Sequence, residues 1–491
     1  MLKINSHARH ALYSVDATRR IEHAAQAVLP PHTLMQRAGL AVAQLALAIA
    51  PHAQRIWIAC GPGNNGGDGL EAALHLQRWG KSPVVTWLGS LDKAPKDAAA
   101  SYSRAVEAGV SFTDTPPQDY DLCIDALLGM GADHRAPEGR MAHWINLMNA
   151  GAAPVLAVDL PTGLQADTGV VAQHSVKARH TLSLLTLKPG LFTAHGRDAA
   201  GIVWLDDLDV VPNPSVDPQI ATLAPTAWLA GAPVGVARRH ASHKGSFGDV
   251  AVVGGAPGMT GAALLAASAA LHAGAGRVFV GLLDGGTLSV NPSQPELMFK
   301  PVEMLDFKAM TVVCGCGGGE AIRGPLSRIL STSAAVVIDA DAINSIAIDH
   351  QLETLLIARG QRTAATVLTP HPLEAARLLG RTATEVQLNR LAAAQQLAQR
   401  FACTVVLKGS GTVIAAPGQT PIINPTGNAR LATAGTGDVL AGMVGARLAE
   451  GLNAFTAASQ AVYQHGLAAD QWQIDATLVA GSLARQAQSG A

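Results

Sequence analysis

The chain has little charge and few aromatic side chains for its length. Of its 491 residues, 14 % are Asp, Glu, Lys or Arg, 4 % are aromatic, and the formal net charge is -1. No basic block stands out. The composition therefore argues against a nucleic-acid partner, because such binding depends on clustered Lys and Arg and on stacking rings. Extensive disorder is disfavoured as well, because 48 % of the residues are hydrophobic and can form large cores.

A disulfide framework and a long apolar run are also lacking. The five cysteines are Cys60, Cys123, Cys314, Cys316 and Cys403. Their odd number and wide spacing indicate a reducing compartment. Cys314 and Cys316 have no second Cys or His pair nearby, so buried strand ends are favoured over a zinc site. The apolar stretch 38–50 is too short to cross a bilayer. We therefore expect a cytoplasmic protein with no membrane partner.

What the sequence does contain is a twofold alternation of strand-like runs and helical stretches, which predicts two α/β domains. The strands expected in the first half are 55–60, 83–89, 122–127, 154–161, 181–188 and 201–206, with a helix at 67–79. In the second half we expect strands at 249–255, 277–283, 310–315, 334–341, 366–371 and 403–409, and helices at 261–273, 384–401, 437–449 and 454–470. Mainly parallel sheets of this kind bind ligands at the carboxyl ends of their strands. The proline-rich stretch 211–235 is interpreted as a linker or a shared edge.

The loop 431–442, LATAGTGDVLAG, is the most informative local pattern. Gly435, Thr436 and Gly437 lead into a helix that has Asp438 in its first turn. The start of a helix attracts a phosphate through its unpaired N–H groups and its dipole. A carboxylate beside a phosphate needs a task of its own, such as accepting a proton, so the loop is typical of phosphoryl transfer. The alternative is that Asp438 only caps the helix.

A second glycine loop, GPGNNGGDG at 61–69, directly follows a strand. Its glycines satisfy the dinucleotide fingerprint, but no acidic residue ends the next strand before Asp92. This disfavours an ordinary hydride-transferring Rossmann domain. Asn64, Asn65 and Asp68 could instead bind a hard cation or a phosphate. Alternatively, the loop is a polar turn and Asp68 is a helix cap.

Three more polar clusters follow strands of the first half. They are Asp125 with GMG at 129–131, Asp159 in DLPTG at 159–163, and LKPG at 187–190. Two carboxylates at strand ends, together with Asn65 and the Thr162 hydroxyl, could form an oxygen cage for a cation. They could equally supply an acid–base residue.

Taken together, LMQRAG at 34–39, GPGNNGGDG, DALLGMG at 125–131 and DLPTG resemble the NAD(P)H-hydrate epimerase domain. The resemblance implies a Rossmann-like three-layer fold over residues 1–212. It also implies a K+ ion held by Asn65, Asp125 and Thr162, where the family usually has Ser in place of Thr162. The substrate contacts that it implies are Asn64, Asn65, Gly66, Gly67, Asp68, Gly129, Met130, Gly131, Ala132, Asp133, His134, Arg135 and Asp159. We expect Asp159 to be the acid–base residue.

The second half carries the ordered motifs HKGSFGDVAVVGG, GAALLAASAALHAGAG, DADAIN, LTPHPLEAARLL, VLKGSGT and TAGTGDVLAG. They resemble the ADP/ATP-dependent NAD(P)H-hydrate dehydratase, which implies a ribokinase-like α/β domain over residues 225–491. Two positions depart from the family pattern: Leu373 replaces a usual glycine, and Cys316 stands where proline is common.

This second resemblance implies that Asp438 activates a substrate hydroxyl for attack on ADP or ATP, with Mg2+. The implied nucleotide contacts are Lys408, Gly409, Ser410, Gly411, Thr412 and Gly437. The implied contacts to the hydrated nicotinamide are Ala262, Gly317, His371 and Asp438. From the residues alone, a histidine between two prolines is more often structural, so both interpretations of His371 stay open.

The two halves in this order resemble a bifunctional repair enzyme for hydrated NADH and NADPH. In such an enzyme one half exchanges the R and S epimers, and the other dehydrates the S epimer through a phosphorylated intermediate. Bacterial members of the family favour ADP. The alternative is a ribokinase-like small-molecule kinase with a non-catalytic binding domain in its first half. In either case we expect a small-molecule substrate and a homo-oligomer.

Overall fold

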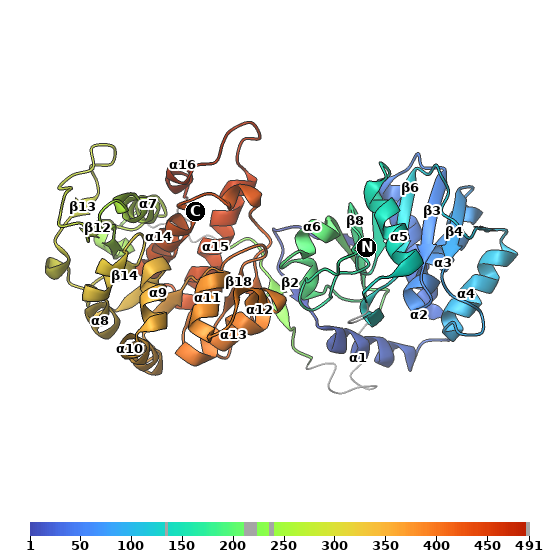
Figure 1. Ribbon diagram of the computed structural model, residues 1–491, viewed down its shortest axis with the longest axis horizontal. Coiled ribbons are helices and arrows are strands. Elements are labelled where there is room, and N and C mark those ends of the chain that lie inside the picture. The colour runs from blue at the N-terminus through green and yellow to red at the C-terminus, as the bar shows by residue number, and fades with distance from the viewer. Residues whose placement is uncertain (133–135, 211–222, 235–239, 488–491) are drawn as a thin grey trace. The chain divides into compact units, whose positions relative to one another are not determined.

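The computed structural model describes residues 1–132, 136–210, 223–234 and 240–487 (Figure 1). The chain divides into two compact units. The first comprises Met1–Asn5 and His10–Ala227, and the second comprises Ser6–Arg9 and Trp228–Ala491. Among the described residues, no helix combines the length and the apolar character needed to span a bilayer.

The first unit is built around an eight-stranded sheet of order β1-β9-β8-β7-β6-β3-β4-β5, in which only β1 runs antiparallel to its neighbour. Its strands are β1 (Leu2–Lys3), β3 (Arg55–Cys60), β4 (Ser82–Trp87), β5 (Ser111–Phe112), β6 (Leu122–Ala126), β7 (Val155–Val158), β8 (His180–Leu184) and β9 (Ile202–Asp206), and β2 (His10–Leu12) precedes the first helix. Its helices are α1 (Val15–Gln26), α2 (Thr33–Ile49), α3 (Asn64–Arg78), α4 (Lys96–Glu107), α5 (Gly139–Ala150) and α6 (Gly196–Ala200).

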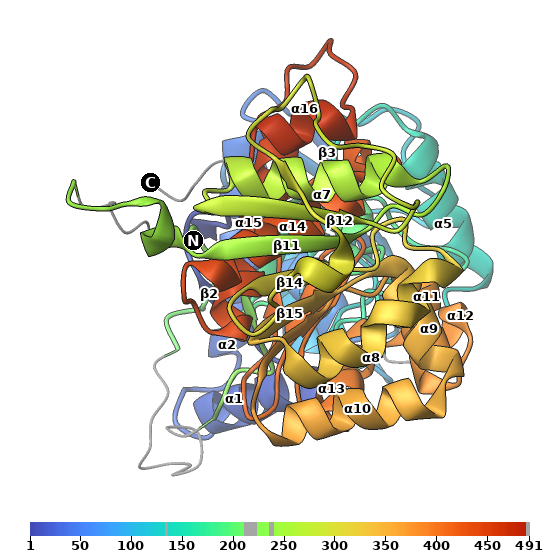
Figure 2. The ribbon, with the colours of Figure 1, turned by 90° about the vertical axis from the view of Figure 1, so that its left-hand side faces the viewer.

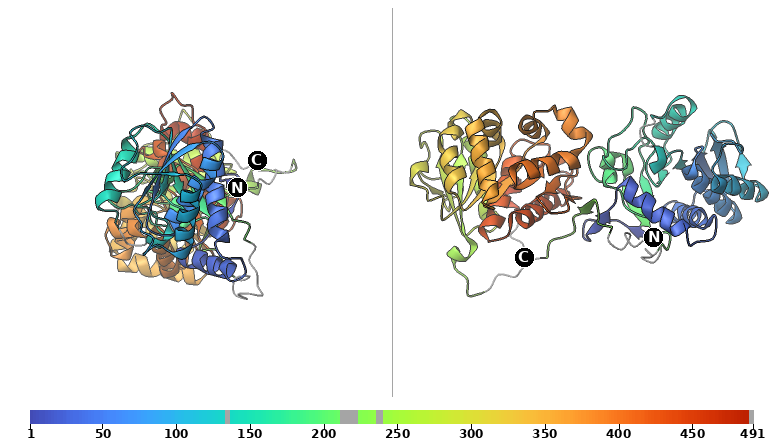
Figure 3. Two further views of the ribbon diagram at one scale, coloured as in Figure 1. Left: turned by 90° about the vertical axis from the view of Figure 1, so that its right-hand side faces the viewer. Right: turned by 90° about the horizontal axis from the view of Figure 1, so that it is seen from below.

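Helices cover both faces of this sheet. Val42, Leu45 and Leu70 from α2 and α3 pack on one face. On the other face, Trp57 of β3 packs with Trp144 and its neighbours from α5. The left view of Figure 3 shows α5 (teal) and the blue helices on opposite sides of the strands. Because both faces are covered, the central strands are continuous apolar runs. This is the three-layer α/β arrangement expected from the sequence.

The second unit also contains a mainly parallel sheet. Its strands run in the order β13-β12-β11-β14-β15-β16-β17, after which the antiparallel strands β18 and β19 and then β10 follow. They are β10 (Ala227–Leu229), β11 (Asp249–Gly254), β12 (Arg277–Leu282), β13 (Met298–Phe299), β14 (Thr311–Cys314), β15 (Ala335–Ile338), β16 (Ala365–Leu368), β17 (Thr404–Leu407), β18 (Val413–Ala415) and β19 (Ile422–Ile423).

The helices of the second unit are α7 (Thr260–His272), α8 (Arg323–Thr332), α9 (Ala340–Ile348), α10 (His350–Gln361), α11 (Pro372–Leu379), α12 (Ala383–Leu388), α13 (Arg390–Phe401), α14 (Thr436–Ala449), α15 (Ala454–Asp470) and α16 (Ala480–Arg485). Helices α7, α14 and α16 pack together, and α7 and α14 contact β11. The connection from β11 through α7 leads to β12, and the connection from β14 through α8 leads to β15, in the opposite direction along the sheet. Because such crossovers are right-handed, α7 and α8 lie on opposite faces of this sheet (Figure 2).

Three sequence-based boundaries differ from the structure. The helix expected at 67–79 begins at Asn64, so most of the first glycine loop is helical. The single helix expected over 384–401 is wrong, because the Asn389 side chain accepts from the Ala392 N–H and starts α13 as a separate helix. In the expected linker 211–235, residues 211–222 and 235 lie outside the described residues, whereas Ala227–Leu229 form β10 beside β19.

Two candidate active sites

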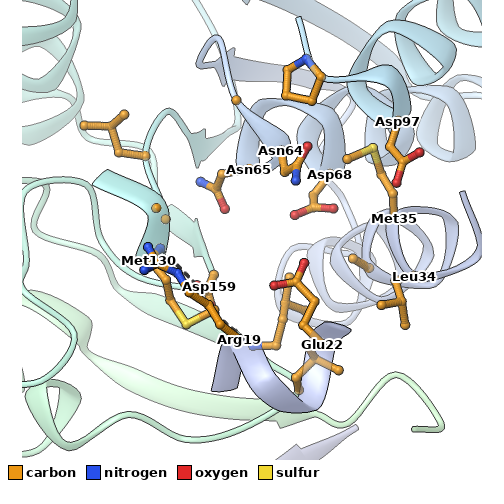
Figure 4. A pocket seen from close by; sticks show the side chains of 18 of the residues that line it. Arg19, Glu22, Leu34, Met35, Asn64, Asn65, Asp68, Asp97, Met130 and Asp159 are labelled. Atoms are coloured by element: carbon orange, nitrogen blue, oxygen red, sulfur yellow. Dashed lines mark hydrogen bonds between the residues drawn. The ribbon is translucent and has the colours of Figure 1, made fainter. Parts of the chain in front are cut away.

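A cavity of about 390 Å3 lies at the carboxyl edge of the first sheet. Strands β8, β7, β6 and β3 are neighbours there, and the segments that follow them converge. Figure 4 shows the side chains that line the cavity. The predicted site residues among them are Asn64, Asn65, Asp68, Gly129, Met130, Gly131 and Asp159. Of the other predicted contacts, Gly66 and Gly67 are not in the lining, Ala132 ends the short helix Met130–Ala132, and Asp133, His134 and Arg135 lie outside the described residues.

The first turn of α3 brings its polar side chains to this cavity. The helix begins after Gly63, and Asp68 lies inside it, so the helix-cap alternative for Asp68 is wrong. Gly66 is needed for close packing, because a Cβ there would lie 2.0 Å from the carbonyl oxygen of Gly61. This contact presses the turn against the end of β3, and Asn64 and Asp68 then project from one helix face, four residues apart.

Asp125 and Thr162 form a fully buried oxygen cluster beside the cavity wall. The Thr162 hydroxyl donates to Asp125 Oδ1 at 2.7 Å, and the Thr162 N–H donates to Oδ2 at 2.8 Å. Burial raises the pKa of Asp125 to about 6, and these donors oppose the shift. Among the described residues, the hydrogen-bond partners of Asp125 are Leu127 and Thr162, and neither is basic. Buried carboxylate and hydroxyl oxygens without a cationic partner fit a hard monovalent or divalent cation.

The side chain of Asn65 is a further buried polar group in this region. Its side-chain Nδ2 is buried without a hydrogen-bond partner, and its Oδ1 lies 3.0 Å from the position of a Cβ on Gly129. The amide therefore faces the 127–131 loop, next to the Asp125 cluster. The proposed cation ligands Asn65, Asp125 and Thr162 thus come from neighbouring segments. These are the first turn of α3, the end of β6 and the loop after β7.

Asp159 is held by a lysine that the sequence motifs did not single out. Lys188 Nζ donates to Asp159 Oδ1 at 2.5 Å, and it also donates to the Leu184 carbonyl and to the Ser183 hydroxyl. Lys188 is completely buried, and Asp159 adopts a left-handed backbone with φ of 64°. Such strain in a non-glycine residue costs about 1–3 kcal/mol and is common at functional sites. The only sequence signal for Lys188 was the LKPG cluster at a strand end.

In the second unit, Asp438 lies at the start of α14 without capping it. Gly435 is the N-cap residue with φ of 89°, and Asp438 makes no capping hydrogen bond, so the capping alternative is wrong. The Cys316 sulfur instead lies within 4.8 Å of an Asp438 carboxylate oxygen. Burial raises the pKa of Asp438 to about 6, and the charge of Asp339 acts in the same direction. A carboxylate that titrates near neutrality suits a general base.

Lys408 lies beside this carboxylate at the end of β17. Its Nζ donates to Asp339 Oδ1 at 2.7 Å, and a Cβ on Gly437 would lie 3.4 Å from the same nitrogen. Burial lowers the pKa of Lys408, but the charges of Asp339 and Glu374 outweigh it, so the net shift is upward. Lys408 therefore remains charged next to the first turn of α14, where a phosphate would be bound. Sequence analysis did not identify Asp339 as a site residue, although it opens the DADAIN motif.

The predicted nicotinamide contacts divide into two groups. A Cβ on Gly317 would lie 2.8 Å from the Cβ of Ala262, so these two residues adjoin, and Gly317 follows Cys316. His371 is the N-cap of α11, where its Nδ1 accepts from the N–H groups of Leu373 and Glu374. The structural interpretation of His371 is thus confirmed, and its substrate contact stays a prediction. Leu373 is 47 % exposed.

A buried histidine braces the start of α14 and makes stability depend on pH. His465 of α15 donates from Nε2 to the Thr436 carbonyl at 2.9 Å, and burial lowers its pKa from 6.5 to about 4.

The contribution of the neutral His465 to the free energy of unfolding is complete above the unfolded-state pKa of 6.5 and is lost as the pH falls toward 4. We expect this loss to reach about 3 kcal/mol in urea unfolding experiments. His465→Gln keeps an N–H donor but does not titrate, so its unfolding free energy should fall less steeply over this range. Equal slopes in the two proteins would contradict the assignment.

Comparisons with known proteins match both units. Residues 250–489 match a family model described as NAD(P)H-hydrate dehydratase, and residues 31–190 match one described as YjeF-related protein N-terminus. A bifunctional NAD(P)H-hydrate repair enzyme of Escherichia coli (strain K12) is 35 % identical over 486 residues, which cover 94 % of this chain and 89 % of that protein. An ADP-dependent (S)-NAD(P)H-hydrate dehydratase of Neisseria meningitidis serogroup B is 46 % identical over 255 residues, covering 50 % of this chain and 85 % of that protein. A crystal structure of an ADP/ATP-dependent NAD(P)H-hydrate dehydratase from Bacillus subtilis, co-crystallised with ATP/Mg2+, covers 52 % of this chain and 92 % of its own, with a TM-score of 0.46 and 29 % identity.

Proposed function

Because the chain belongs to the family of bifunctional NAD(P)H-hydrate repair enzymes, we propose that it restores hydrated NADH and NADPH to the reduced cofactors. The second unit dehydrates the S epimer at the expense of ADP or ATP, and the first unit exchanges the R and S epimers. The observation that carries the proposal is the Asp438 carboxylate at the start of α14, next to the Lys408 ammonium.

The dehydration begins at the C6 hydroxyl of the hydrated ring. Asp438 accepts the hydroxyl proton while the oxygen attacks the terminal phosphorus of the nucleotide, and the shortened nucleotide leaves. The C6–O bond then breaks with loss of phosphate, and loss of a proton from C5 forms the C5=C6 double bond. Lys408 and the N–H groups at 435–437 balance the phosphate charge in the transition state. Mg2+ bound with the nucleotide supplies further charge neutralisation.

The nucleotide contacts are proposed on the loop after β17. The Lys408 and Leu407 carbonyls both accept from the buried guanidinium of Arg390 at 3.1 Å, which fixes the direction in which this loop leaves the sheet. Gly409 has φ of 135°, and a Cβ there would lie 2.9 Å from Arg390. The backbone from Lys408 to Thr412 is thereby available for close approach of the phosphates.

In the first unit we propose Asp159 as an acid–base residue and Asn65, Asp125 and Thr162 as ligands of a K+ ion. The buried, uncompensated Asp125 carboxylate supports the ion. Bound K+ would supply positive charge that orients the 127–131 loop at the cavity wall. We do not propose the small-molecule kinase alternative, because relatives match this chain across both units.

Thr162→Val should weaken K+ binding, because it removes the hydroxyl that donates to Asp125 Oδ1. We expect the apparent K+ affinity to fall roughly 10-fold or more, by analogy with the loss of other metal-site groups. Both the K+-dependent rise in melting temperature and the K+-dependent rate of epimer exchange report this change. Thr162→Ser keeps the hydroxyl and serves as the matched control. A wild-type protein whose stability and exchange rate are the same in K+ and in a bulky organic cation would contradict the ion site.

Nucleotide-dependent recovery of the dihydronicotinamide absorbance tests the proposed repair. A mixture of hydrated NADH epimers is incubated with the protein and with ADP or ATP. Full recovery of absorbance, faster than the epimers exchange spontaneously, supports both activities. Rapid recovery that stops when only the S epimer has been consumed, at about half, supports only the dehydratase. Nucleotide binding without recovery would contradict the function. The preference for ADP, the homo-oligomer, the cytoplasmic location and the lack of nucleic-acid or membrane partners stay predictions.

A further inference from the structure

The cavity of the first unit holds more carboxyl groups than the proposed function has used so far. Glu22, Asp68, Asp97 and Asp159 all line it, and Arg19 is the one basic residue in the described lining. Asp97 is paired with His32 at 2.6 Å. Figure 4 shows the carboxyl groups of Glu22 and Asp68 turned toward the same space. Two carboxyl groups besides Asp159 are therefore open to a ligand.

Hydrogen-bond donors surround the Asp159 side chain. The Lys188 ammonium has three protons, and its three acceptors are Asp159 Oδ1, the Ser183 hydroxyl and the Leu184 carbonyl. The Leu184 and Met130 N–H groups also face the two carboxylate oxygens, at 3.3 and 3.4 Å. A buried ammonium and two N–H donors all favour the charged form of the carboxyl group.

Asp68 has the opposite environment. Among the described residues no hydrogen-bond donor or basic group pairs with its carboxyl group, and burial raises its pKa well above the usual range. The charged groups with the largest effect on it are acidic and raise the pKa further; these groups are Asp159, Glu22, Glu71 and Asp97. The surroundings of Asp68 therefore favour its protonated form, whereas Asp159 lies against the Lys188 ammonium. Two nearby carboxyl groups in unlike environments are the usual arrangement of an acid and a base.

Glu22 is the competing candidate for the acid. Its pKa is also raised by burial and by Asp159, but the charges of His23, Lys188 and Arg19 oppose the shift. For Asp68, burial and the acidic neighbours that dominate the shift all raise the pKa. Asp68 also projects from the first turns of α3, which close packing of Gly66 against Gly61 fixes in place.

We propose that Asp68 and Asp159 form an acid–base pair that removes and returns water at C6 of the hydrated nicotinamide on opposite faces of the ring, with Lys188 as a positioning residue. The proposal rests on the epimerase function proposed above, and it assigns that function its second catalytic residue.

The reaction balances without a further reactant. Asp68 donates its proton to the C6 hydroxyl, the C6–O bond breaks, and water leaves with the electron pair of that bond. The N1 lone pair forms a C6=N1 double bond, and the acidic cavity stabilises the resulting cation. A water molecule then attacks C6 from the other face and gives its proton to Asp159. The reverse reaction uses the two residues in exchanged roles, and proton exchange with solvent restores the starting state.

The test compares Asp68→Asn with Glu22→Gln in the full-length protein. We expect Asp68→Asn to lower the rate of epimer exchange about 10^2- to 10^4-fold, the usual contribution of general acid catalysis. Glu22→Gln should lower it far less. Dehydration of the isolated S epimer by the second unit should be unchanged in both, and an unchanged melting transition of the first unit shows that this unit is folded. Asp92→Asn, an exposed carboxyl-to-amide change in the same unit, is the matched control.

The pH profile and isotope exchange separate catalysis from structure. Because the pKa of Asp68 is raised, the wild-type exchange rate should fall on the alkaline side as Asp68 loses its proton. Lys188→Met should slow epimer exchange and leave the alkaline-side fall in place, because Asp159 loses the ammonium that holds it while Asp68 is untouched. Each inversion in oxygen-18 water should place one labelled oxygen at C6. Asp68→Asn with a wild-type rate and profile, or inversion without label, would overturn the acid–base pair while leaving the epimerase function in place. A wild-type protein that does not accelerate exchange would instead contradict the epimerase function itself.

Discussion

Asp438→Asn is expected to abolish nucleotide-dependent recovery of NADH while leaving nucleotide binding intact. The amide is nearly the same size as the carboxyl group, but it cannot accept the proton of the C6 hydroxyl. Removing a general base beside a preorganised phosphate site costs about 10^2- to 10^4-fold in rate. Single-turnover recovery of the dihydronicotinamide absorbance from the S epimer measures this loss, and calorimetric titration with ADP measures the binding.

The pH dependence provides a second readout of the same residue. Because burial raises the pKa of Asp438 to about 6, the wild-type rate should decline as the pH falls through this value. Asp475→Asn, an exposed change in the same unit, is the control and should keep both rate and profile. An Asp438→Asn protein that recovers NADH at more than a tenth of the wild-type rate would contradict the role of Asp438 as the base.

Lys408→Met is expected to have the largest combined effect on stability and activity. Lys408 is the ion-pair partner of Asp339, whose side chain is only 2 % exposed. Removing one partner of a buried ion pair leaves an uncompensated charge and costs about 3–5 kcal/mol. The same change removes the ammonium beside Gly437, so ADP affinity should fall as well. Urea unfolding and calorimetric ADP titration measure the two effects.

A double variant separates the two effects of Lys408→Met. Adding Asp339→Asn removes the stranded carboxylate, while the amide can still accept the hydrogen bond from the Thr369 hydroxyl at 2.7 Å. We expect the double variant to regain most of the lost stability and none of the ADP affinity. A Lys408→Met protein with the wild-type free energy of unfolding would contradict the structure. It would show that the ion pair of Lys408 and Asp339 is exposed to water in solution.

The fold was largely predictable because the signals for strands are local. β3 occupies the expected residues 55–60, and the other predicted strands of both units are present within a few residues. The α/β class is therefore confirmed. The break at Asn389 was missed because apolar spacing continues across it, and only the side-chain cap interrupts the helix.

Sequence analysis could predict only those site residues that belong to motifs at the ends of strands. The pair of Asp159 and Lys188 spans 29 residues, and that of Lys408 and Asp339 spans 69, so neither partner could be assigned from local pattern. Glu22 comes from α1, where no motif marks it. Tertiary packing creates these contacts, together with the burial that shifts the pKa values of Asp68 and Asp438.

The three departures from the family pattern have different structural contexts. Thr162 keeps the hydroxyl contact to Asp125, and Leu373 is half exposed at the start of α11. Cys316 is fully buried and brings its thiol within 4.8 Å of an Asp438 carboxylate oxygen, a polar group that proline at this position could not supply. The thiol lowers the pKa of Asp438, against the larger effect of burial.

Recovery of NADH from each isolated epimer tests the two-site account most directly. The S epimer should be consumed at once when ADP is added, without need of the first unit. The R epimer should be consumed at a rate set by epimer exchange, and Asp159→Asn should slow only this second reaction. Equal slowing of both epimers by Asp159→Asn, or failure of either epimer to yield NADH with the wild-type protein, would contradict the account.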